Sequence, residues 1–183
     1  MSKKYILTNE TKDYSGTTLY RIQYVIDIPK YDIKAGDLGG WIEKEENLCH
    51  EDSCVVTDNA RVLDDAQVYD NARVYGNAVV CDDAQIYDGA QVYGNANING
   101  NANIYDNARV YDNANVGDDT AIFDNAQVHG NACISDDASV FDNAQVHGNA
   151  VINGSACIFD NAKVYGNAQI SGDSEICGDT EVK

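Results

Sequence analysis

The chain has 183 residues, and its 30 acidic residues against 12 basic ones give a formal net charge of −18. A charge of this size repels nucleic acids and membrane surfaces and attracts basic protein surfaces. No run of about 18 apolar residues is present, which excludes a membrane-spanning helix, and the first ten residues lack the apolar stretch of a secretory signal, so a cytoplasmic protein is expected.

Residues 1–53 differ in composition from the rest of the chain and are expected to form a small β cap domain. Residues 17–28 (TTLYRIQYVIDI) alternate in places like a strand, and residues 4–8 (KYILT) are expected to pair with them. Residues 35–43 (AGDLGGWIE) carry turn residues and the single Trp. Such a cap would cover the open end of the repeat array that follows, as solenoids require for solubility.

A six-residue repeat fills residues 54–183, the second predicted domain. Every sixth residue from Ala60 to Thr180 is Ala, except at Thr120, Ser174 and Thr180, and an aliphatic residue follows two positions later. Val and Ile favour strands, whereas the Asp-Asn, Gly-Asn and Asp-Asp pairs between them favour turns with left-handed backbone angles. Each hexad therefore predicts a short strand and a corner, with the Ala and the aliphatic residue both pointing inward.

The residue after each aliphatic position keeps its character at intervals of 18, which predicts three strands per coil and three faces. The first face carries Tyr75, Tyr93, Tyr111, His129, His147 and Tyr165; the second carries Cys81, Asn99, Gly117, Ser135, Asn153 and Ser171; the third carries Tyr69, Tyr87, Tyr105, Phe123, Phe141 and Phe159. The predicted fold is all-β, a triangular parallel β-helix of about seven coils that rises about 4.8 Å per coil.

The segments VYGNAQI, VHGNAVI and IFDNAKV resemble the hexapeptide repeat of left-handed β-helix proteins. The left hand of the predicted helix is implied by this resemblance and not by the periodicity. More narrowly, AGDLGGWIE followed by Asn-Ala hexads resembles phage and prophage proteins of unassigned function, which implies the cytoplasm of a bacterial host as the location. A shared fold does not determine function, so functional predictions rest on the surface residues.

Enzymatic activity is not expected, although hexapeptide β-helix proteins are often acyltransferases with a general-base His and a substrate site built by loops. The chain has three histidines, His50, His129 and His147, but no insertion interrupts a coil. His129 and His147 are expected to stack one coil apart, and their neighbours Gln127 and Gln145 complete no metal site. The six cysteines form no CxxC pair, so we expect free thiols, no metal and no cofactor.

The outward aromatic residues are candidate surfaces for partner binding or self-association. They are Tyr69, Tyr87, Tyr105, Phe123, Phe141 and Phe159 on the third face, and Tyr75, Tyr93 and Tyr111 on the first. The three phenylalanines have small neighbours, and the resulting apolar strip favours contact with another molecule, including a second copy of the chain in a dimer or trimer. The simpler interpretation is that stacked rings only stabilise neighbouring coils, by roughly 0.2–1 kcal/mol per pair.

Aspartates line both corners that border the third face and are candidate partner-binding residues. The corner before this face holds Asp64, Asp65, Asp82, Asp83, Asp118, Asp119, Asp136 and Asp137, and the corner after it holds Asp70, Asp88, Asp106, Asp124, Asp142 and Asp160. From Cys54 onward, 20 acidic and 5 basic residues give a net charge of −15, which is about 0.4 charges per Å over roughly 35 Å, against about 0.6 for duplex DNA. Turn chemistry alone would also favour Asp at corners, but the remaining corner is mostly Gly-Asn.

These features predict a non-enzymatic, acidic interaction protein that binds a basic protein surface and forms a homo-oligomer. The phage resemblance implies an inhibitor that imitates the charge of nucleic acid and occupies the nucleic-acid-binding surface of a host or defence protein. Two alternatives stay open, namely a self-assembling structural scaffold and a hexapeptide acyltransferase.

Overall fold

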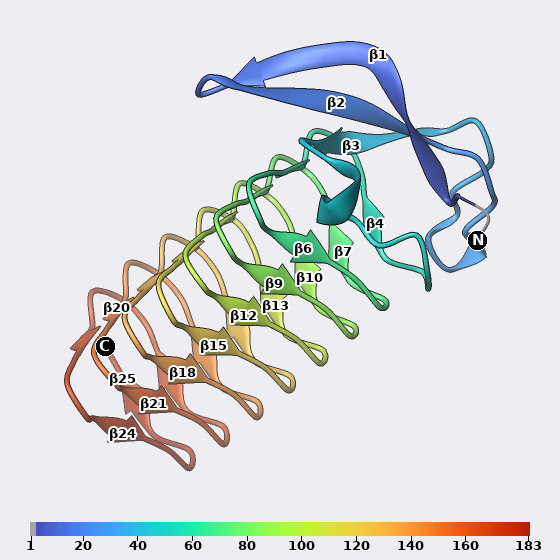
Figure 1. Ribbon diagram of the computed structural model, residues 1–183. Helices are drawn as coiled ribbons and strands as arrows, with labels where there is room; N and C mark the ends of the chain where they lie inside the picture. The colour runs from blue at the N-terminus through green and yellow to red at the C-terminus, as the bar shows by residue number, and fades with distance from the viewer. Residues whose placement is uncertain (1–2) are drawn as a thin grey trace.

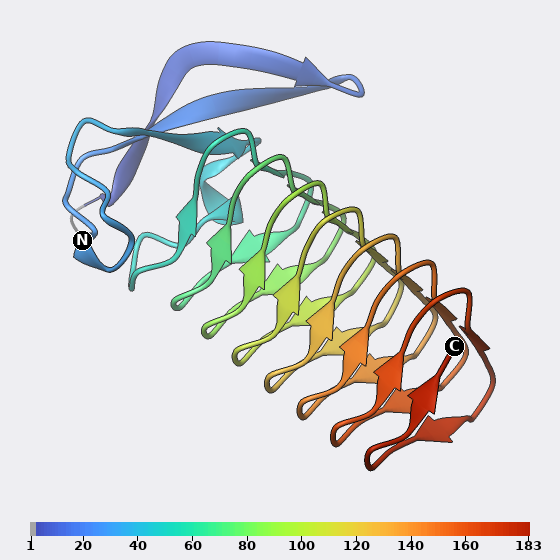
Figure 2. The ribbon, with the colours of Figure 1, turned by 180° about the vertical axis from the view of Figure 1, so that it is seen from behind.

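The computed structural model describes residues 3–183, so residues 1–2 of the expected cap lie outside the described part. The chain is an all-β parallel solenoid whose coils follow one another from the N-terminal cap to the C-terminus (Figure 1). The view from behind shows the same uninterrupted stack of coils (Figure 2). The predicted fold class is confirmed.

Each coil contributes one two-residue strand to each of three sheets. The first face consists of β4 (Val55–Val56), β7 (Arg73–Val74), β10 (Gln91–Val92), β13 (Arg109–Val110), β16 (Gln127–Val128), β19 (Gln145–Val146), β22 (Lys163–Val164) and β25 (Glu181–Val182). The second face contains β5 (Arg61–Val62), β8 (Val79–Val80), β11 (Asn97–Ile98), β14 (Asn115–Val116), β17 (Cys133–Ile134), β20 (Val151–Ile152) and β23 (Gln169–Ile170). The third face consists of β6 (Gln67–Val68), β9 (Gln85–Ile86), β12 (Asn103–Ile104), β15 (Ala121–Ile122), β18 (Ser139–Val140), β21 (Cys157–Ile158) and β24 (Glu175–Ile176).

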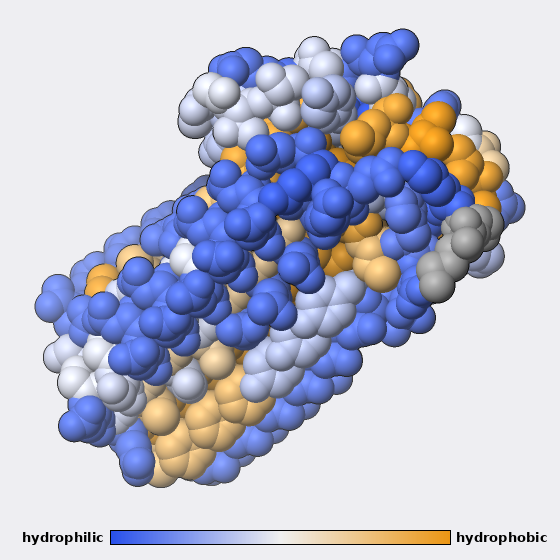
Figure 3. Space-filling view, in the orientation of Figure 1, coloured by the Kyte–Doolittle hydropathy of each residue, from blue (hydrophilic) through white to orange (hydrophobic). Residues whose placement is uncertain are grey.

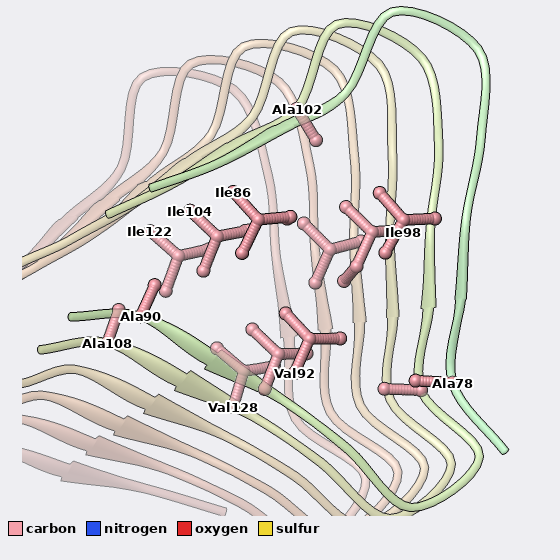
Figure 4. Close-up of a cluster of buried hydrophobic side chains, with 14 of the residues drawn as sticks. Ala78, Ile86, Ala90, Val92, Ile98, Ala102, Ile104, Ala108, Ile122 and Val128 are labelled. Carbon is pink, nitrogen blue, oxygen red and sulfur yellow. The ribbon is translucent and has the colours of Figure 1, made fainter. Parts of the chain in front are cut away.

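The pairing register is 18 residues throughout the solenoid, because every coil has the same length. Val92 lies beside Val110 on the first face, and Ile104 lies beside Ile122 on the third. In Figure 4 the chain runs anticlockwise as the coils recede from the N-terminal one in front, which is a left-handed turn. The hand implied by the resemblance therefore agrees with the structure.

The core is formed by the hexad alanines and by the aliphatic residues two positions later. From Ala60 to Val164 these side chains are at most 1% exposed. The aliphatic side chains of the three faces meet inside the coil, while the alanines lie close to the turns (Figure 4). Thr120 replaces one alanine, and its buried hydroxyl donates to the carbonyl oxygen of Gly117 at 2.6 Å. Small residues are required at these positions because the chain bends sharply beside them.

The corners all turn through a left-handed residue, as their sequences predict. From Asp58 to Gly178, the first residue of each corner is either an Asp with φ between 53° and 60° or a Gly with positive φ. Asp and Gly tolerate this backbone region better than most residue types. A Cβ at Gly76 would lie 3.0 Å from the backbone nitrogen of Gly94, a tight contact, although Asp58 and Asp112 occupy the equivalent position in other coils.

The N-terminal segment adds a hairpin and one further coil. β1 (Tyr5–Tyr14) and β2 (Thr17–Tyr24) pair antiparallel, which confirms the predicted pairing of residues 4–8 with residues 17–28. β2 pairs with β3 (Leu38–Ile42), and β3 then pairs in parallel with β5. β3 and a bridge between Leu48 and Val68 form a coil ahead of Cys54, so the solenoid has about eight turns instead of the predicted seven. Two short 3₁₀ helices, Pro29–Tyr31 and Glu45–Asn47, lie on either side of β3.

The hairpin has two contacts with the solenoid. At its base, Tyr5, Ile22 and Tyr24 are fully buried and extend the solenoid core. Farther out, the hairpin lies over the start of the second face, where Leu19 packs with Leu63 and other residues in a separate apolar cluster (Figure 1). Within residues 3–183, no helix has the length and apolar character needed to cross a membrane.

Candidate binding surface

The third face carries a ladder of stacked aromatic rings along most of its length. Consecutive rings from Tyr69 to Phe159 have centroids 4.8–5.1 Å apart and planes within 4° of parallel. Each ring is partly buried by its neighbours and partly open to solvent. Figure 3 shows this ladder as a continuous stripe, pale where the tyrosines lie and tan where the phenylalanines lie, with hydrophilic residues on both sides.

The tyrosine hydroxyls of this ladder carry no charge near neutral pH. Burial, followed by the neighbouring Tyr69 and Tyr105 and by nearby aspartates, raises the pKa of Tyr87 to about 12. Burial also raises the pKa of Tyr69 and of Tyr105. The negative charge along the third face is therefore supplied by carboxylates at its two edges.

Most aspartates at the first position of a corner are hydrogen-bonded to the next coil. In ten coil-to-coil steps, the Asp Oδ2 accepts a hydrogen bond from the backbone N–H of the first corner residue 18 positions later, at 2.9–3.4 Å. Asp106, Asp124, Asp142 and Asp160 accept such bonds in consecutive coils, and the last of these bonds comes from Gly178. This structural task was missed in the sequence analysis, although the recurrence of Asp at 18-residue intervals was visible there.

The aspartates at the second corner position, before the third face, are less constrained. Asp65 pairs with Lys44 at 2.6 Å, and Asp119 accepts a hydrogen bond from the side-chain amide of Asn101 at 2.7 Å. The carboxylates of Asp83 and Asp137 are exposed and have no hydrogen-bond partner among the described residues. These two carboxylates are available to a partner without breaking any internal contact.

The first face carries a second ladder, which differs in charge from the third. Its rings, from Tyr75 to Tyr165, have centroids 4.7–5.3 Å apart. Arg73 packs on this ladder, with its guanidinium carbon 4.1 Å from the Tyr75 centroid, and Arg109 and Lys163 occupy equivalent strand positions in later coils. The corner after this face holds a ladder of asparagine amides, in which Asn95 donates to Asn113 at 3.0 Å. The first face is therefore the less acidic of the two aromatic faces.

His129 and His147 stack within the first-face ladder, with centroids 4.9 Å apart. Burial and the neighbouring His147 lower the pKa of His129, whose Nδ1 lies 3.8 Å from Asp112 Oδ2. Among the described residues no loop leaves a coil beside them. Both histidines occupy the ladder position that tyrosine holds in neighbouring coils.

A cleft of about 390 Å³ lies at the N-terminal start of the third face. His50 forms one wall, where its ring stacks on Tyr5 at 4.3 Å and its Nδ1 accepts a hydrogen bond from the backbone N–H of Lys4 at 3.2 Å. The cleft is open to the first ring of the ladder and is acidic, being lined by Glu45, Glu46, Leu48, Cys49, His50, Gln67, Val68 and Tyr69. Such a lining suits a cationic side chain better than an acyl donor.

The cysteines of the described chain are free thiols. Cys81 lies close to the carboxylates of Asp64 and Asp82, and their ligand atoms are within 4.8 Å of one another. Burial, followed by these two aspartates, raises the pKa of Cys81 to about 12. The Cys81 thiol is therefore protonated near neutral pH when no metal ion is bound.

Comparison with protein families identifies the same repeat. The model described as YdcK Beta solenoid repeat matches residues 66–82 and residues 102–118, and each match follows one coil from the third face through the first to the second. The chain is a β-solenoid repeat protein. No curated protein matches this solenoid protein.

Proposed function

We propose that this solenoid is a non-enzymatic binding protein whose third face docks on a basic protein surface. The observation that carries the proposal is an aromatic ladder bordered on both edges by rows of carboxylates. The outward strand positions beside the rings are Gln67, Gln85, Asn103, Ala121, Ser139 and Cys157, so no Lys or Arg of this face offsets the acid. Rings with acidic edges match a surface on which arginine and lysine alternate with apolar groups.

The charge of the solenoid supports a nucleic-acid-binding groove as the target. The net charge of −15 from Cys54 onward corresponds to about 0.4 charges per Å, which approaches the value of about 0.6 for duplex DNA. The rod is rigid because every coil bonds to the next along three sheets. In the finer proposal, which rests on the resemblance to phage and prophage proteins, the protein inhibits a host or defence protein by occupying this groove.

The cleft at the start of the third face extends the proposed docking surface. It places Glu46 beside the Tyr69 ring, whereas Glu45 is already paired with Lys3. Glu46 and the ring together can hold an ammonium or guanidinium group by charge and by stacking. A partner that lies along the ladder would insert one such side chain at the N-terminal end. The cleft would then fix the position of the partner along the otherwise repetitive rod.

The role of the acidic edge is tested with an affinity-capture experiment that uses matched charge variants as bait. The test variant is Asp65→Asn, Asp83→Asn, Asp119→Asn and Asp137→Asn, which removes four charges from one edge of the third face. The control removes four charges away from the third face, three from the N-terminal segment and one from the corner after the first face, by Glu10→Gln, Asp13→Asn, Asp32→Asn and Asp112→Asn. We expect salt-sensitive capture of a nucleic-acid-handling protein by the wild type and the control, and weaker capture with a flatter salt dependence by the test variant.

Equal capture by all three baits, or capture that salt leaves unchanged, would contradict the proposal. A second substitution set, Asp88→Asn, Asp106→Asn, Asp124→Asn and Asp142→Asn, addresses the other edge. We expect it to retain the fold, because Asn also tolerates the left-handed corner and can accept the hydrogen bond from the next coil. Saturable binding of coenzyme A, lost on His129→Ala or His147→Ala, would instead support an acyltransferase.

The alternative function is a self-assembling scaffold, which the apolar half of the third face favours. Phe123, Phe141 and Phe159 stack without hydroxyl groups, beside small outward residues (Figure 3). Two copies that met through this strip would bring acidic edges together, so their association should strengthen as salt increases. Binding to a basic partner has the opposite dependence on salt.

Sedimentation velocity over a range of protein concentrations tests the scaffold. Phe141→Glu should leave only the monomer if the strip joins two copies, whereas Phe141→Tyr, which keeps the ring, should change the association little. A wild-type protein that remains monomeric at high concentration and high salt would exclude this alternative.

A further inference from the structure

Three cationic side chains converge where the hairpin lies beside the second face. Trp41 of β3 has Arg21 of β2 as its cross-strand neighbour on one side and Arg61 of β5 on the other. The guanidinium carbon of Arg21 lies 5.1 Å from the Trp41 ring centroid, and Lys12 Nζ of β1 lies 5.5 Å from the same centroid. Arg61 lies 4.8 Å above the ring of Tyr14. Two strands of the hairpin and two of the solenoid therefore hold one basic cluster.

The cluster is not neutralised by the chain, although the protein carries a net charge of −18. In the described part of the chain, ion pairs occupy Lys3, Lys34, Lys44 and Lys163, and none involves Lys12, Arg21 or Arg61. Burial, followed by Arg61 and Arg21, lowers the pKa of Lys12. The three cations repel one another, and the repulsion would be relieved by an anion between them.

The same cluster contains polar hydrogens with no acceptor. The Nε atoms of Arg21 and Arg61 and the Nε1 of Trp41 are buried and have no hydrogen-bond partner among the described residues. A buried donor without an acceptor costs free energy, and the cost is larger when the donor is charged. Three such donors in one place indicate that an acceptor belongs there.

Stacking on the aromatic rings explains only part of this arrangement. A guanidinium that lies over a ring uses its flat face, while its N–H groups point outward in the plane and still require acceptors. The ring of Trp41 has two cations over it, which the attraction of one ring does not explain. All three cations are partly exposed, so a small ligand can reach their charged ends.

We propose that Lys12, Arg21, Arg61 and the indole N–H of Trp41 bind a phosphate group of a small ligand. Phosphate offers several acceptor oxygens and about −1.5 to −2 charges near pH 7, which matches three cations better than the single charge of a carboxylate. Arginine pairs with phosphate through two parallel hydrogen bonds. This site has the opposite charge to the acidic rows, and it is independent of the function proposed for the third face.

Trp41 is the single tryptophan of the chain, so its fluorescence reports directly on this site. The experiment is a titration of the full chain with inorganic phosphate, at constant ionic strength maintained with chloride. We expect a saturable change in Trp41 emission for the wild type. The double variant Arg21→Gln, Arg61→Gln should bind phosphate about tenfold more weakly or worse, because it loses two charge-assisted contacts.

Arg109→Gln, which removes one charge from an exposed position on the first face, is the control and should bind phosphate as the wild type does. Lys12→Gln provides a second test variant if the double variant fails to fold, and it should also bind phosphate more weakly. Wild-type emission that does not saturate, equal binding by Lys12→Gln and the wild type, or acetate binding as tightly as phosphate would each overturn the proposal.

Discussion

An aspartate at the first position of a corner has two tasks that few residue types can combine. Asp124 adopts a φ of 55°, and its carboxylate accepts the backbone N–H of Asp142 in the next coil. Gly would satisfy the backbone angle without the hydrogen bond, and Ala would satisfy neither. The abundance of Asp at these corners therefore has a structural cause in addition to any function in binding.

Three substitutions at Asp124 separate these two tasks. Asp124→Asn should leave the free energy of unfolding within about 0.5 kcal/mol of the wild type, because it keeps both the backbone angle and an acceptor. Asp124→Gly should cost about 1 kcal/mol through the lost hydrogen bond, and Asp124→Ala about 2–3 kcal/mol through the added strain. Denaturant unfolding measures the series, and an Ala variant as stable as the Asn variant would show that the corner is not strained.

At the level of single residues, the sequence was most informative about the interior. The inward positions follow directly from the alternation of side chains along each strand, so Ala60 and Val62 could be assigned to the core without a structure. The bond from Asp106 to the next coil could not be predicted, since it depends on how a left-handed corner directs its carboxylate. The basic cluster around Trp41 was also missed, because its members are brought together by the hairpin and lie far apart in sequence.

At the level of the secondary-structure elements, the first-face ladder differs from the third-face ladder in containing two histidines, which can take up protons in mild acid. In the first-face ladder, burial and His147 lower the pKa of His129 below its usual value of about 6.5. The unfolded chain therefore takes up a proton more readily than the folded chain. The stability linked to His129 is complete above pH 6.5 and is lost as the pH falls through and below that value.

Thermal unfolding at pH 7.5 and pH 5.5 tests this dependence. His129→Tyr restores the residue found at this ladder position in three earlier coils, and it should reduce the loss of melting temperature between the two pH values. Tyr111→Phe keeps both histidines and should lose as much melting temperature as the wild type. An unchanged pH dependence in His129→Tyr would show that other groups dominate the acid sensitivity.

The arrangement of the elements could be predicted for the repeat and only partly for the cap. The 18-residue recurrence of outward residues gave three faces, because strands of one sheet must stack in register. The parallel pairing of β3 with β5 was not foreseen, because Leu38–Ile42 lacks the hexad signature. This strand carries Gly39 and Gly40, and Gly40 stands at the position that the inward alanine holds in the repeat. A Cβ at Gly40 would lie 2.6 Å from Val56, so an alanine would not fit at this position of the first coil.

At the level of the whole molecule, charge is distributed very unevenly. The corners that border the third face concentrate carboxylates about 4.8 Å apart along the rod, while the hairpin end holds the basic cluster. Like charges at this spacing destabilise the folded chain, and salt screens that repulsion. We therefore expect the melting temperature to rise by several degrees between about 20 mM and 500 mM sodium chloride.

The variant with Asn at positions 65, 83, 119 and 137 provides the comparison for this salt effect. It should have a higher melting temperature than the wild type in low salt and a smaller rise with salt. Circular dichroism at both salt concentrations measures the two proteins side by side. A wild-type melting temperature that falls with salt would mean that attractive ion pairs outweigh the repulsion between carboxylates.

The constant length of the coil also has a consequence for how such a protein can change over generations. Removing residues 105–122, for example, would join Ile104 to Phe123 at an equivalent position, with the pairing register intact. The shortened rod would lose one ring from each ladder, Asp106 from one edge of the third face, and Asp118 and Asp119 from the other edge, while every remaining contact kept its local geometry. The number of contacts available to a partner can thus be adjusted one coil at a time. The affinity of the protein for that partner can therefore change through the number of coils, without a change at any single contact residue.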